Sequence, residues 1–152
     1  MTKNKVYIII SWILVVACMG VIFYLSARPA TESQEMSDSL IFKIVEIFGI
    51  EFSSRFIRKL AHATEFCILS ILLANAINVT FKSKYTWLFA LGTTIIYGIS
   101  DEIHQIFVEG RACQFKDMLI DSLGALAGVI IWLIFFTIIK RNNERGKKNG
   151  NS

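Results

Sequence analysis

Apolar residues in this 152-residue chain are gathered into blocks. Each block is about 20 residues long, which is the length that a helix needs to cross the hydrocarbon core of a bilayer. The blocks predict four membrane-spanning helices, at about 6–25, 60–77, 87–107 and 117–139. The chain's one proline, Pro29, follows the first block and marks its end. We therefore expect an all-α membrane protein with a single domain over residues 1–139 and a tail over 140–152.

A shorter apolar pattern lies between the first two spans, at about 38–49. Its apolar residues recur at helical spacing, namely Leu40, Ile41, Ile44, Val45 and Phe48. Lys43 and Glu46 face away from that stripe. The segment is too short to span a bilayer. It predicts an amphipathic helix in the first extracytoplasmic loop, lying in the membrane interface or capping the bundle.

Composition agrees with a membrane protein and excludes other classes. Hydrophobic residues make up 54% of the chain and charged residues 18%, against about 25% charged in ordinary soluble domains. This composition excludes a disordered chain, which needs low hydrophobicity. The net charge of +4 does not indicate nucleic-acid binding, because the basic tail has no aromatic residue to stack on a base. Contact with anionic lipid explains the surplus better.

The basic residues also predict the orientation in the membrane. They are dense in the tail and recur on the same side of the predicted spans, namely Lys3, Lys5, Lys82, Lys84, Lys140, Arg141, Arg145, Lys147 and Lys148. Only Glu144 is acidic among them. Because cytoplasmic loops are enriched in Lys and Arg, we expect a multi-pass protein of the cell membrane with both termini in the cytoplasm.

Ionisable residues within the spans should gather at one end of the bundle. The second and fourth spans begin on the side where the third ends. A charge at mid-membrane costs about 2.5–3.5 kcal/mol on insertion scales, so these side chains are expected to converge inside the bundle. Candidate catalytic residues are His62, Glu65, Asp101, Glu102, His104 and Asp121. Candidate ligand-binding residues are Arg58, Lys59, Gln105, Arg111 and Asp117.

Several chemistries fit such a cluster. A histidine oriented by a carboxylate can act as a general acid or base, while Arg58 and Arg111 clamp a phosphate or carboxylate. Two histidines with carboxylates are also an acceptable ligand set for a divalent metal, although no HExxH motif is present. The cluster could instead bind an anionic headgroup or a drug without catalysis. It could also be a buried ionic network that fixes helix register. Whether the protein is an enzyme stays open at this point.

Two glycine positions add local expectations. Gly124 and Gly128 form a GxxxG pattern that allows another helix to approach closely. Gly110 permits a tight turn before Arg111, which would aim the guanidinium over the mouth of a pocket. There it would pair with Asp117 or Asp121, or reach a ligand.

Three segments together resemble the VanZ family: FYLSARPATES, RKLAHATEF and SDEIHQIFVEGRACQFKDMLIDSLGALAG. The resemblance covers nearly the whole chain apart from the tail. It carries over the motif residues Lys59, His62, Glu65, Asp101, Glu102, His104, Gln105, Gly110, Arg111, Asp117 and Asp121. It implies a small multi-pass membrane protein of bacteria, from a family whose namesake is linked to resistance to teicoplanin, a glycopeptide that acts on cell-wall precursors.

Residues and resemblance together predict a cell-envelope protein. Its outward-facing His/Asp/Glu/Arg pocket would act on or bind a lipid-linked component, such as a wall precursor, or another anionic envelope component. The alternative is a non-enzymatic binding or assembly protein in which the polar cluster is structural. The spacing of these residues predicts neither a particular metal cofactor nor an oligomeric state.

Overall fold

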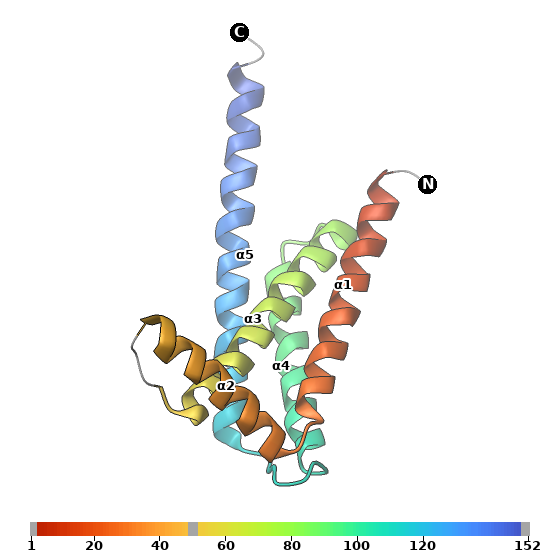
Figure 1. The fold of residues 1–152 in the computed structure, drawn as a ribbon. Coiled ribbons are helices and arrows are strands. Elements are labelled where there is room, and N and C mark those ends of the chain that lie inside the picture. Colours follow the sequence, from red (N-terminus) through yellow and green to blue (C-terminus); the bar gives the residue numbers. More distant parts are fainter. Residues whose placement is uncertain (1–2, 49–51, 150–152) are drawn as a thin grey trace.

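The chain folds into helices joined by short connections (Figure 1). The structure, a computed structural model, describes residues 3–48 and 52–149. These ranges contain five helices and no strand: α1 (Lys3–Ser26), α2 (Ala30–Phe48), α3 (Ser54–Phe81), α4 (Thr86–Gln105) and α5 (Phe115–Asn149). The all-α prediction is therefore confirmed.

Three of these helices are long and apolar enough to cross a membrane: Asn4–Ser26, Ser54–Phe81 and Phe115–Gly146. They correspond to the first, second and fourth predicted spans. The third predicted span corresponds to α4. This helix is not apolar enough to be counted with the other three, because its C-terminal end carries Asp101, Glu102, His104 and Gln105. The structure thus shows a helical protein of membrane character, and a fourth crossing by α4 stays a prediction.

Helix α2 begins at Ala30, earlier than the expected start near residue 38. Its first turns are polar, so the sequence pattern predicted a loop there, but one local and one long-range backbone hydrogen bond stabilise them. Ser33 N–H donates to Pro29 O over 3.1 Å, and Ala30 N–H donates to Glu109 O over 3.1 Å. The last residue of the predicted amphipathic helix, at 49, lies outside the described residues.

Helix α3 is the centre of the bundle and packs against the other four helices. Its contact with α5 is close enough to exclude side chains. A Cβ on Gly124 would lie 2.2 Å from Ala63 O, and a Cβ on Gly128 would lie 2.2 Å from Cys67 O. Ser70 Oγ also donates to Ala125 O over 2.9 Å. The close approach predicted from the GxxxG pattern is confirmed.

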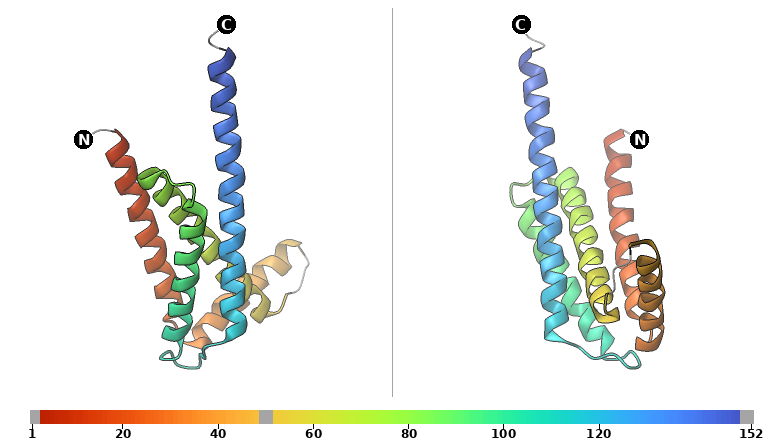
Figure 2. Two further views of the ribbon diagram at one scale, coloured as in Figure 1. Left: turned by 180° about the vertical axis from the view of Figure 1, so that it is seen from behind. Right: turned by 60° about the vertical axis from the view of Figure 1, so that its left-hand side comes forward.

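The two ends of the bundle differ (Figures 1 and 2). Both termini lie at one end, which we call the terminal end. The ends of α1 and α4 and the starts of α2, α3 and α5 meet at the other, which we call the polar end. Helix α2 crosses the outside of α3 at the polar end, and α5 extends far beyond α3 and α4 at the terminal end.

Candidate functional site

A cavity of about 350 Å³ opens at the polar end. Its polar and charged lining comes from α2, α3, α4, α5 and the connection between the last two: Gln34, Arg55, Arg58, Lys59, His62, Gln105, Arg111, Gln114, Asp117 and Asp121. A smaller cavity of about 80 Å³ shares Arg58, His62 and Arg111 with it and adds Glu65. Segments far apart in the sequence therefore bring eight of the eleven candidate residues to these two cavities.

The floor of the larger cavity holds an acid–base pair without hydrogen bonds. His62 Nδ1 lies 3.9 Å from Asp121 Oδ1, and Asp121 is 2% exposed. Neither carboxylate oxygen of Asp121, nor Nδ1 of His62, has a hydrogen-bond partner in the described part of the chain. A buried polar group left unpaired costs about 1–3 kcal/mol, so the arrangement lowers stability. Such groups are typical of sites that complete their bonding with a ligand.

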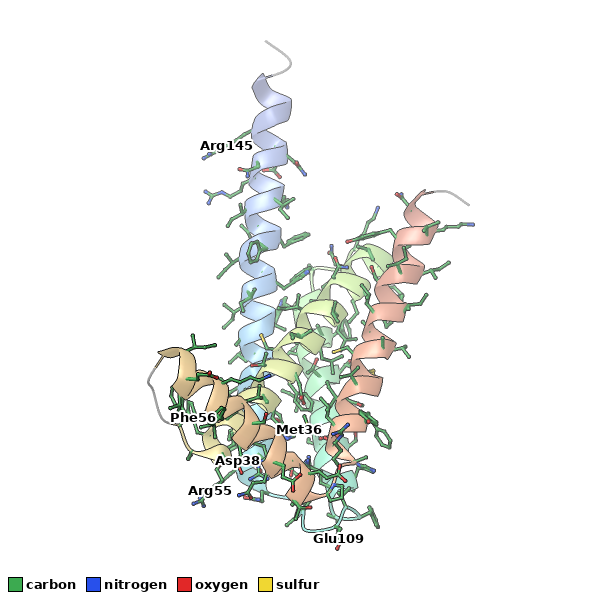
Figure 3. The ribbon with its side chains drawn as sticks, in the orientation of Figure 1. Met36, Asp38, Arg55, Phe56, Glu109 and Arg145 are labelled. Atoms are coloured by element: carbon green, nitrogen blue, oxygen red, sulfur yellow. The ribbon has the colours of Figure 1, made fainter. Side chains whose placement is uncertain are left out.

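The rim of the cavity carries more positive than negative charge. Lys59 Nζ pairs with Asp117 Oδ1 over 2.5 Å. Arg55 and Arg58 form no ion pair within residues 3–48 and 52–149. Figure 3 shows Arg55 at the outer edge of the polar end, near the start of α3. Two uncompensated guanidinium groups beside the cavity favour an anion there.

Asp101 lies outside both cavities and joins α4 to α1. Its Oδ2 accepts from Ser26 Oγ over 2.7 Å and from Gln105 Nε2 over 3.1 Å. Sequence reasoning missed Ser26. The available signal was its place directly after the first apolar block, as the first residue of the segment SARP, at the same end of the bundle as Asp101. This network ties the two helix ends together.

Glu102 also lies outside the cavities and stabilises the loop after α4. Its Oε2 accepts from the backbone N–H of Gln114 over 2.9 Å, while Oε1 has no partner among the described residues. The carboxylate is 1% exposed. Glu102 therefore positions the segment that carries Arg111, rather than facing either cavity.

Arg111 makes neither of the predicted pairings with Asp117 or Asp121. Its Nε donates to Arg28 O over 2.9 Å and its Nη2 donates to Leu25 O over 3.4 Å. The guanidinium thus donates to one carbonyl in the last turn of α1 and to one in the turn that follows it, and Leu25 O also accepts from the backbone N–H of Arg28 over 3.4 Å. Burial lowers the pKa of Arg111, and Arg58 adds to the shift. The side chain still lines both cavities.

The turn before Arg111 has the predicted backbone. Gly110 has φ +71°, which favours glycine, and a Cβ there would lie 3.1 Å from Ala30 Cβ. The loop thus lies close to the start of α2, and the hydrogen bond from Ala30 N–H to Glu109 O holds it there. The turn therefore directs Arg111 onto α1 as well as toward the cavity.

His104 lines neither cavity. Its ring contacts Phe23 of α1, with ring centroids 4.5 Å apart. Two histidines therefore do not converge on one point. Among the residues that the structure describes, no three His, Cys, Asp or Glu side chains are placed to hold a metal ion.

Fold and site together define a helical protein of membrane character with a polar cavity at one end. The chain matches the family model VanZ/LLP1 over residues 11–136, from α1 into α5. It therefore belongs to the VanZ/LLP1 family and is a VanZ-type envelope protein, in agreement with the resemblance. No curated protein and no solved structure gives a significant match.

Proposed function

We propose that this protein binds the anionic headgroup of a lipid-linked envelope component in the cavity at its polar end. One observation carries the proposal: the uncompensated Arg55 and Arg58 lie on the rim of a cavity whose floor holds the unpartnered pair His62 and Asp121. Guanidinium groups bind phosphate and carboxylate through two parallel hydrogen bonds. The carboxylate of Asp121 would then accept a donor group of the same ligand.

Helix α2 favours a lipid over a soluble anion. It flanks both cavities, and it exposes the large apolar side chains Met36, Leu40, Phe42 and Ile47. Met36, Leu40 and Ile47 share one face of α2 at helical spacing. An exposed apolar face on a charged helix is typical of a helix lying in the membrane interface. A headgroup could then enter the cavity while its hydrocarbon chains stay in the bilayer.

The pair of His62 and Asp121 favours a second candidate, catalysis on the bound headgroup. Histidine can move a proton, and Asp121 can orient its ring once a ligand shortens the 3.9 Å separation. In the non-enzymatic alternative, the protein only binds or assembles, and the ionic cluster is structural. The Ser26–Asp101–Gln105 network fits that structural role, whereas the unpaired Asp121 does not.

Lipid binding can be tested with the full chain in nanodiscs. We expect a polyprenyl phosphate to bind more tightly than the matching polyprenol, and Arg58→Gln to weaken phosphate-lipid binding at least tenfold. Lys43→Gln on α2 is the matched control, because it removes the same charge outside the cavity lining. Equal binding of the two lipids, or an equal loss in both variants, would contradict the proposal.

Asp121→Asn separates a functional cluster from a structural one. Asp121 is buried without hydrogen bonds, so the variant, in which a neutral amide replaces the carboxylate, should equal or exceed wild type in membrane abundance and thermal stability. Lipid affinity or conversion should fall. A loss of protein that parallels the loss of binding would instead support the structural alternative.

We also propose that both termini are cytoplasmic and that the cavity faces outward. The position of both termini at one end, together with the basic tail, supports this topology. A fluorescent reporter fused after Ser152 should be active. Activity of an alkaline-phosphatase fusion at that position would reverse the orientation.

A role in resistance to teicoplanin-type glycopeptides is the finer proposal that follows from family membership. Expression of the protein in a susceptible bacterium should raise the inhibitory concentration of teicoplanin, and Arg58→Gln at equal abundance should abolish the increase. An unchanged inhibitory concentration with the wild-type chain would remove this role but not lipid binding.

A further inference from the structure

A larger cleft, of about 910 Å³, lies at the terminal end. It is lined by parts of α1, α3, α4 and α5 and by the turn between α3 and α4. The residues that matter here are Tyr7, Lys82, Lys84, Trp87, Trp132 and Lys140. None of them belongs to the site at the polar end.

The cleft follows from how the helices end. Helix α3 stops at Phe81, where Lys82 takes a left-handed conformation with φ 49°, and α4 starts at Thr86. Helices α1 and α5 continue past this turn and lie apart from each other (Figure 2). The turn therefore forms the side of a space that α1 and α5 leave open toward the surroundings.

The walls of the cleft are amphipathic. Trp132 stacks on Phe136 with ring centroids 4.9 Å apart, and both line the cleft. Trp87 contributes a third large aromatic side chain. Tryptophan is enriched where a membrane protein crosses from the apolar core to the headgroups. The aromatic wall is thus suited to the region between acyl chains and headgroup.

The charge of the cleft has one sign. Three lysines line it, and no Asp or Glu of the described chain does. Lys84 Nζ lies 4.9 Å from the centre of the Tyr85 ring, and it forms no ion pair with a carboxylate among the described residues. Exposed ammonium groups near a membrane surface attract anionic lipid by about 1 kcal/mol each.

We propose that an anionic glycerophospholipid occupies this cleft. Its phosphate lies among Lys82, Lys84 and Lys140, and its acyl chains lie along Trp132 and the apolar faces of α1 and α5. Charge complementarity selects an anionic headgroup, and the aromatic wall selects a lipid over a free phosphate. This site is independent of the cavity at the polar end.

The test is native mass spectrometry of the full chain with phosphatidylglycerol and phosphatidylcholine at equal mole fraction. Wild-type protein should retain phosphatidylglycerol at least fivefold more often. The cleft variant combines Lys82→Asn, Lys84→Gln and Lys140→Gln. Asparagine is used at 82 because it tolerates the left-handed conformation. This variant should lose the preference, since its cleft has no cation.

A matched control removes the same charge beyond the cleft, with Lys5→Gln, Arg141→Gln and Arg145→Gln. These side chains are exposed and do not line the cleft. The control should keep the lipid preference, and soluble glycerol 1-phosphate should not displace the lipid. Equal retention of both lipids by wild type, an equal loss in both variants, or displacement by glycerol 1-phosphate would overturn the proposal.

Discussion

The two ends of this bundle differ in how far their charged side chains are buried and paired. At the polar end, the acids Asp101, Glu102 and Asp121 are buried, and Asp101 bonds across helices to Ser26. At the terminal end, lysines are the only charged residues of the described chain that line an open cleft, and they need no protein partner. A buried charge costs several kcal/mol unless it is paired, whereas an exposed one costs little. The polar end therefore depends on tertiary packing, and the terminal end depends on its surroundings.

The largest expected effect comes from the α3–α5 contact, on which the polar end depends. Gly128→Ala places a Cβ 2.1 Å from Ser70 Oγ and 2.2 Å from Cys67 O. Because Cys67 O is a backbone atom, relieving this overlap requires α3 or α5 to shift. We expect a loss of about 3 kcal/mol, at the upper end of typical overpacking costs. Thermal unfolding in detergent and membrane abundance measure it.

Gly92→Ala is the matched control for that change. It lies in α4, and nothing lies within 4 Å of the added Cβ. Alanine is the better helix former, so stability should stay equal or rise by up to about 1 kcal/mol. Equal stability in the two variants would mean that α3 and α5 do not approach as described.

Ser26→Ala tests the bonding between α1 and α4 at the polar end. The variant removes a buried hydrogen bond to the Asp101 carboxylate, so we expect a loss of about 1.5–3 kcal/mol. Ser100→Ala is its control, because that exposed hydroxyl bonds only to Tyr97 O of its own helix. Denaturant unfolding of both variants should show a loss in the first alone. Similar small changes in both would show that Asp101 finds another partner.

Arg111→Lys should weaken the loop after α4. Lysine keeps the charge but cannot reproduce two bonds to Leu25 O and Arg28 O, so we expect a loss of about 1 kcal/mol. Hydrogen exchange should speed up at the C-terminal end of α1. Arg55→Lys, at the exposed rim, should leave exchange there unchanged. If exchange at α1 stays slow in Arg111→Lys, the guanidinium is not its cap.

The smallest effect is expected for Lys59→Gln. This side chain is 38% exposed and its partner Asp117 25%, and pairs of this kind contribute up to about 1 kcal/mol. The loss should shrink as salt rises, because salt screens exposed charges. A large loss of stability that does not depend on salt would mean that the Lys59–Asp117 pair is as well shielded from solvent as the buried polar groups.

Several features were determined by the sequence alone. Apolar blocks of helical length predicted the helices, and their alternating direction placed both termini at one end and the ionisable residues within the spans at the other. The glycines of α5 predicted a close approach by another helix, and the structure shows that this helix is α3. These features follow from length, periodicity and side-chain size, which are local properties of the chain.

Other features were decided only by the tertiary structure. The spacing set the depth of each polar residue but not the rotation of each helix about its axis. That rotation turns His62 toward Asp121 and His104 toward Phe23. The close α3–α5 contact buries Asp121 without a hydrogen-bond partner. The loop after α4 passes the end of α1, so Arg111 donates to the carbonyl of Arg28. Both outcomes depend on contacts between segments distant in the chain, which periodicity within one segment does not encode.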